Sequence, residues 1–109
     1  MENLRRSKRV QAQHFISYDL LDGEGRVVHS GIALSRNLSR EGILIEDRRA
    51  FPIDSIVKLN VAVIDEVMAI RSKVRHVENA GKNTYTIGLE FVDKDEEMIQ
   101  TFMNYYPDL

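Results

Sequence analysis

The sequence of 109 residues contains no cysteine and only two prolines. Without cysteine the chain can form neither a disulfide nor a thiolate metal site, which fits a reducing compartment. No apolar run approaches the ~20 residues that a membrane helix needs, and the charged N-terminus is unlike a secretory signal. We therefore expect a cytoplasmic protein that does not insert into a membrane.

The chain also lacks a large excess of charge of either sign. It has 15 basic and 17 acidic residues and a net charge of −2, which argues against a general nucleic-acid binder. The charges are nevertheless segregated. Residues 93–97 are mostly acidic, whereas residues 5–9 hold Arg5, Arg6, Lys8 and Arg9 with no acid. This basic cluster can form a local anion site, but not a long phosphate-binding surface.

Signatures of catalysis are missing as well. The histidines at 14, 29 and 76 are not at metal-ligand spacing, and Ser39 has no base beside it in the sequence. Neither GxGxxG nor GxxxxGK[ST] occurs. We predict that the protein is not an enzyme and uses no metal or cofactor.

Alternating apolar and polar residues predict a single all-β domain over residues 1–109, apart from a helix at its end. Hydrophobic residues make up 43% of the chain, enough to build a core. Turn sequences at 22–25 and 79–83 separate strands that we expect at 15–21, 26–39, 43–45, 57–63, 67–78 and 84–92. A closed barrel protects strand edges, so we predict a six-stranded antiparallel β-barrel over residues 13–92.

Two irregularities are expected in these strands. Gly31 predicts a bulge or sharp bend in the second strand, and the change of apolar parity near Arg75 and His76 predicts a bulge in the fifth. After Gly31, we expect Ile32, Leu34 and Leu38 to face the core. The opposite parity is small and polar and predicts a face for contact, made of Ala33, Ser35, Asn37 and Ser39.

Residues 93–106 predict a C-terminal helix. Asp93 can cap its start, Pro107 ends it, and an apolar stripe follows helical spacing at Met98, Ile99, Phe102, Met103 and Tyr106. The stripe can cover a barrel opening, or it can pair with a second copy. The expected state is accordingly a monomer or a weak homodimer.

Two polar segments form the candidate binding site. Residues 1–12 have no apolar periodicity and are predicted to be a flexible basic arm that binds ligand. Asn37 and Ser39 lie two apart, so on a strand both side chains project from one side, and Gly42 follows where the chain must turn. The arm supplies planar positive charge, and the Asn37/Ser39 pair supplies hydrogen-bonding groups for the edge of a planar base.

These residues resemble the signature of the PilZ domain family, receptors of the bacterial second messenger cyclic di-GMP. The resemblance covers roughly residues 5–92, with an N-terminal arginine pair before the first strand and a polar motif on a later strand and its turn. Asn37 stands where aspartate is commoner in the family. The matching segments are Arg5-x-x-x-Arg9, Asn37-x-Ser39-x-x-Gly42 and the strand Ile87-Gly88-Leu89-Glu90-Phe91.

The resemblance implies a PilZ-type barrel that binds cyclic di-GMP, changes conformation and signals to an unidentified effector protein. It implies that Arg5 and Arg9 are the principal ligand residues, that Arg6 assists them, and that Asn37, Ser39 and Gly42 complete the site. An alternative is an adaptor of the same fold that binds protein only, with the basic arm docking on an acidic surface. Only the receptor requires all the motif residues together.

Overall fold

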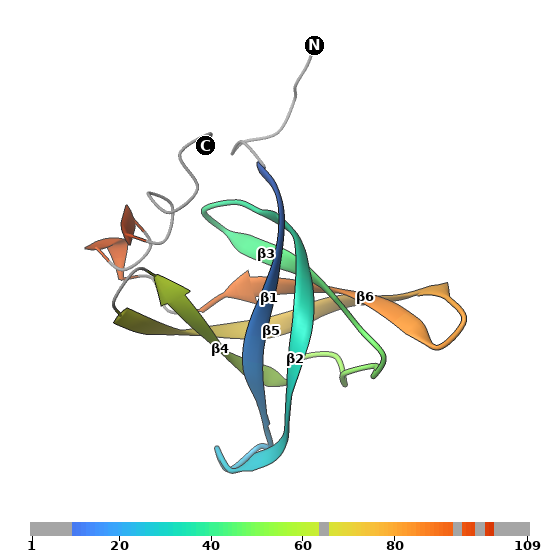
Figure 1. Cartoon of the computed structure of the whole chain (residues 1–109). Coiled ribbons are helices and arrows are strands. Elements are labelled where there is room, and N and C mark those ends of the chain that lie inside the picture. The colour runs from blue at the N-terminus through green and yellow to red at the C-terminus, as the bar shows by residue number, and fades with distance from the viewer. Residues whose placement is uncertain (1–9, 64–65, 93–94, 98–99, 102–109) are drawn as a thin grey trace.

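Six antiparallel strands close into a barrel in the computed structural model, which describes residues 10–63, 66–92, 95–97 and 100–101. Around the barrel the strands follow the order β1-β2-β3-β6-β5-β4, and β4 pairs with β1 to close it (Figure 1). The strands are β1 (Val10–Leu21), β2 (Val27–Leu38), β3 (Gly42–Asp47), β4 (Ile56–Val63), β5 (Glu66–Gly81) and β6 (Thr84–Phe91). The predicted six-stranded antiparallel barrel is confirmed.

Alternating side chains of the strands fill the barrel. Ile16, Tyr18 and Leu20 of β1 are buried, as predicted from their shared parity. On β6, Ile87, Leu89 and Phe91 are buried on the same principle. Strands β1 and β6 lie opposite each other around the barrel, and these side chains meet in one hydrophobic core.

The inward face of β2 differs from the prediction. Ala33 and Ser35 are buried, whereas Ile32, expected in the core, is 66% exposed. The register of β2 against β3 shifts between Ser35 and Asn37, so Arg36 is an extra residue that reverses the parity of the strand. Leu38 is buried, as predicted, although it has the opposite parity to the buried Ala33 and Ser35, and Asn37 lies outside the core.

Gly31 does not mark the bulge that the sequence predicted. It pairs regularly with Tyr18, and a Cβ atom at Gly31 would lie 2.8 Å from the Tyr18 hydroxyl oxygen. The glycine is thus explained by the tyrosine packed over it. The other expected bulge is confirmed, because the register of β5 against β6 shifts between Val74 and His76.

Tyr18 joins β1 to the end of β3. Its hydroxyl donates a hydrogen bond to Asp47 Oδ2, and its ring packs on Phe51 with centroids 5.0 Å apart. Burial, the hydrogen bond and the negative charge of Asp47 raise the pKa of Tyr18 well above its usual range. The folded protein therefore favours the neutral phenol.

Tyr18→Phe should lower the free energy of unfolding by about 1.5–3 kcal/mol near neutral pH, because a hydrogen bond to a carboxylate is lost. In the unfolded chain Tyr18 ionises near pH 10, while in the folded protein it keeps its proton, so wild-type stability should fall as the pH rises above about 10. Urea unfolding at several pH values checks both effects. The variant should lose less stability than the wild type over this range, and parallel curves would contradict the assignment.

The two ends of the chain depart from the predicted boundaries. Strand β1 begins at Val10, so residues 10–12 belong to the barrel and not to the predicted arm; residues 1–9 lie outside the described part. Of the predicted helix over 93–106, only 95–97 and 100–101 are described. Thr101 Oγ1 donates a hydrogen bond to the Glu97 carbonyl (2.9 Å), and the helix over 93–106 stays a prediction. Among the described residues, no helix is long and apolar enough to span the bilayer.

Candidate functional site: the β2–β3 turn and an outer groove

The turn between β2 and β3 is built by Ser39. The Ser39 N–H donates to the Gly42 carbonyl (2.9 Å), and the Glu41 N–H donates to Ser39 Oγ (3.2 Å). The Ser39 side chain is fully buried. The expectation that Ser39 projects outward beside Asn37 is therefore wrong, because β2 ends at Leu38 and the serine folds into the turn that follows.

Gly42 lets two strands come close together. It pairs with Glu90 across β3 and β6, and a Cβ atom at this position would lie 2.1 Å from the Leu89 carbonyl oxygen. Its φ is not positive, in contrast to that of Gly25 and Gly81. The glycine is thus required by the approach of the Leu89 backbone, and not by a left-handed turn conformation.

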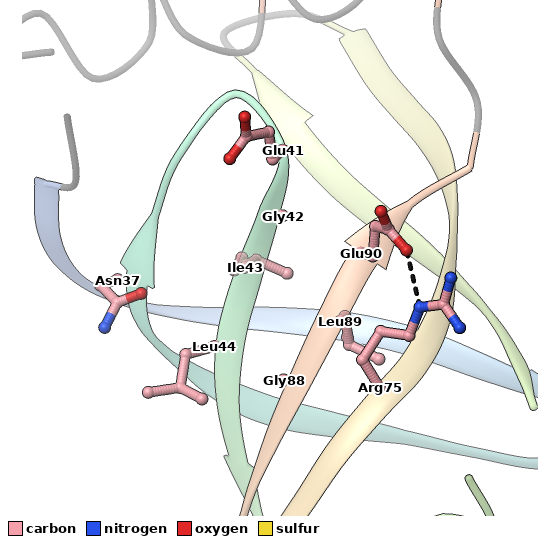
Figure 2. Close-up of a pocket in the computed structure, with 9 residues that line it drawn as sticks. All are labelled: Asn37, Glu41, Gly42, Ile43, Leu44, Arg75, Gly88, Leu89 and Glu90. Atoms are coloured by element: carbon pink, nitrogen blue, oxygen red, sulfur yellow. Dashed lines mark hydrogen bonds and ion pairs between the residues drawn. The ribbon is translucent and has the colours of Figure 1, made fainter. Parts of the chain in front are cut away.

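A groove of about 430 Å³ opens on the outer face of the barrel below this turn. Cross-strand pairing places Asn37 of β2 opposite Leu44 of β3, Leu44 opposite Gly88 of β6, and Gly88 opposite His76 of β5. Figure 2 shows Asn37 at one side of the groove and Arg75 at the other. The lining residues are Asn37, Glu41, Gly42, Ile43, Leu44, Arg75, Gly88, Leu89 and Glu90.

The charged groups of the described lining are Arg75, Glu90 and Glu41. Arg75 Nε donates to Glu90 Oε1 at 2.7 Å, and Arg75 Nη1 lies 3.5 Å from Asp54 Oδ1. Hydrogen bonding and charge attraction from Glu90 raise the pKa of Arg75, so its guanidinium is always protonated. Among the described residues, no group of three or more His, Cys, Asp or Glu side chains could hold a metal ion.

The sheet brings the start of β1, which follows the basic segment in the sequence, close to the turn. Val10 pairs with Leu38, and Gln11 pairs with Asn37. Arg9 directly precedes Val10 in the sequence, and Ser39 directly follows Leu38. The β1–β2 pairing therefore places the residue after the basic segment opposite a residue of the Asn37–Gly42 motif. Arg5, Arg6 and Arg9 themselves lie outside the described residues.

Arg40, the residue after Ser39, contacts the C-terminal segment. Its Nη2 donates to Gln100 Oε1 at 3.1 Å, and both side chains are exposed. Arg40 does not line the groove. The cation that does, Arg75, was not predicted as a site residue, although the predicted bulge at 75–76 pointed to this place, since bulges often redirect side chains at functional sites.

A protein-family model identifies the family of this chain. A PilZ domain model matches residues 3–106, almost the whole chain. The chain belongs to the PilZ domain family. The predicted resemblance is confirmed. A search of curated proteins found no match to the chain.

Solved structures share this PilZ fold. The Bacillus subtilis inhibitor of motility, MotI/DgrA, aligns with a TM-score of 0.68 and 16% identity over 98% of this chain and 52% of its own. MrkH of K. pneumonia in complex with cyclic di-GMP gives 0.70 and 14% over 98% and 52%. The PilZ domain of YcgR from Escherichia coli, with cyclic di-GMP, gives 0.64 and 14% over 90% and 85%. The chain thus spans about half the length of MotI/DgrA and MrkH, and at these identities the likeness shows the fold alone.

Proposed function

We propose that this PilZ domain is a receptor for cyclic di-GMP and has no catalytic role. The observation that carries the proposal is the pairing of Val10 with Leu38, because Val10 directly follows the Arg5-x-x-x-Arg9 segment in the sequence and Leu38 lies within the Asn37–Gly42 motif. Two structures of similar fold, MrkH and the PilZ domain of YcgR, have been solved with this ligand.

The chemistry of the groove suits one end of such a ligand. Cyclic di-GMP carries two phosphodiester charges and two guanines. The backbone of Gly88 and the side chain of Leu44 offer a surface on which the flat face of a base can lie. The Asn37 carboxamide, at the edge of this surface, supplies donors and an acceptor for the rim of the base.

The arginines supply the remaining interactions in this proposal. A guanidinium can hold a phosphate or the O6/N7 edge of guanine with two parallel hydrogen bonds, and its plane can stack on a base. Arg5 and Arg9 are assigned these contacts, and Arg6 assists. Ser39 and Gly42 act by shaping the turn, since one is buried and the other packs on Leu89.

In this proposal, the domain signals because the ligand bridges two segments of the chain. A ligand held by both the 5–9 segment and the β2–β3 turn would create a new composite surface, which an effector protein can recognise. The partner is defined only by this requirement, that it distinguishes the liganded from the free surface.

Isothermal titration of the purified protein tests the receptor function. Cyclic di-GMP should bind, whereas cyclic di-AMP should bind at least about tenfold more weakly, because adenine presents a donor where guanine presents O6. GMP is the second comparison, since it lacks the second nucleotide. Equal affinity for the adenine analogue would contradict guanine recognition, and no binding of cyclic di-GMP would leave the adaptor alternative.

A further inference from the structure

Arg75 occupies the bulge of β5 on the far side of the groove from Asn37. The pairing of β5 with β6 passes from Val74–Leu89 directly to His76–Gly88, so Arg75 is the extra residue. Its side chain stands beside the groove, next to Glu90 (Figure 2). A bulge redirects the side chain that it inserts, and here it adds a cation to the groove wall.

Two acids hold this arginine. Glu90 accepts from Nε at 2.7 Å, and Asp54 lies 3.5 Å from Nη1. A guanidinium has five N–H donors, and these contacts engage two of them. Because the Arg75 side chain is 54% exposed, the ion pairs contribute little to stability, so the fold alone gives a weak reason for them.

We propose that Arg75 is a further cyclic di-GMP-binding residue of this domain and that Glu90 is its counter-ion in the free protein. The proposal rests on the receptor function proposed above and assigns the groove wall opposite Asn37. Gly88 and Leu44 lie between the two walls, so a base lying on them would have Asn37 at one edge and the guanidinium at the other. The groups that Arg75 would bind are a guanine O6/N7 edge or a phosphodiester, both of which suit its planar fork.

Glu90 sets the affinity of the site in this scheme. The ligand is an anion, and the carboxylates of Glu90 and Glu41 both line the groove that receives it. Glu90→Gln removes one negative charge while retaining an oxygen that can accept from Arg75 Nε. The substitution should therefore leave the arginine oriented and reduce repulsion of the ligand.

Titration calorimetry with cyclic di-GMP on the full chain tests both residues. Arg75→Ala should weaken binding about tenfold or more, Arg75→Lys should not restore it, and Glu90→Gln should tighten binding a few-fold. The matched control is Arg26→Ala. Arg26 is also an exposed arginine held by two acids, Asp22 (3.2 Å) and Glu24 (2.9 Å), but it lies at the β1–β2 turn, at the other end of the barrel (Figure 1).

The outcomes separate this inference from the receptor function. If the wild type binds and Arg75→Ala binds as tightly as Arg26→Ala, the assignment of Arg75 is overturned while the receptor function stands. Weaker binding by Glu90→Gln would overturn the counter-ion role and make Glu90 a positioning residue. Failure of the wild type to bind overturns both proposals. Should Arg75→Ala not fold, Arg75→Lys keeps the side-chain stem, and wild-type affinity in that variant would overturn the assignment.

Discussion

Replacing Gly42 with alanine should lower the free energy of unfolding of this PilZ domain by about 1–3 kcal/mol or more, although only one methyl group is added. The methyl carbon would lie 2.1 Å from the Leu89 carbonyl oxygen, 3.1 Å from its carbonyl carbon and 3.3 Å from Glu90 Cα. These are backbone atoms of the neighbouring strand, so no side-chain rotation can relieve the contact. The β3–β6 pairing must shift instead.

Gly23→Ala is the matched control for this prediction. Gly23 lies in the β1–β2 turn, its φ is not positive, and nothing lies within 4 Å of an added Cβ atom. Alanine there should be neutral, or stabilise by about 0.4–1 kcal/mol by restricting the unfolded chain. Urea unfolding of the two variants, followed by circular dichroism, gives the comparison. Equal midpoints for Gly42→Ala and the wild type would show that the strands separate at no cost.

The stability effect also changes how Gly42 is interpreted in the ligand motif. A loss of binding in Gly42→Ala would follow from the displaced β3–β6 pair, which carries Leu44 and Gly88 of the groove. The residue can therefore be essential to binding without touching the ligand. Gly42 belongs to the motif because it shapes the turn and the groove floor, and the same holds for the buried Ser39.

Local sequence patterns were sufficient to predict the barrel. Alternation identified the inward face of β1 and β6, and turn sequences such as Asp22-Gly23 separated the strands at nearly the observed places. These signals are local, since a strand shows its two faces within a few residues and a turn within four. The six-stranded closed arrangement followed from the need to protect strand edges.

The errors concern features set between strands that are distant in sequence. The bulge at Arg36 exists only in the register of β2 against β3, and it reversed the expected faces of Ile32 and Ala33. Gly31 was interpreted as a bulge or sharp bend. Its actual cause is the side chain of Tyr18, which lies on another strand and packs over the glycine. The groove depends on four strands, so Arg75 could not be joined to Asn37 before the pairing was known.

Arg9→Ala should weaken the binding of cyclic di-GMP by about tenfold to a hundredfold, since a hydrogen bond to a charged group contributes roughly 1.5–3 kcal/mol. Arg9 is the motif arginine nearest to β1 in the sequence, directly before the residue that pairs with Leu38. Arg9→Lys should not restore affinity, because an ammonium group lacks the planar fork that bonds a guanine edge or a phosphate at two points. Titration calorimetry at fixed ionic strength measures both variants.

Lys8→Ala separates a specific contact from general attraction. It removes the same charge from the adjacent position but lies outside the arginine motif, so it should lower the affinity only slightly, and less as salt is added. A second measurement follows from the proposed signalling: cyclic di-GMP should slow amide hydrogen exchange over residues 4–9 in the wild type and in Lys8→Ala, but not in Arg9→Ala. Equal losses of affinity in Lys8→Ala and Arg9→Ala would show that the basic segment acts only as unspecific positive charge. Binding without any change in exchange would instead leave the arginine contacts in place and require the signal to leave the barrel through another surface.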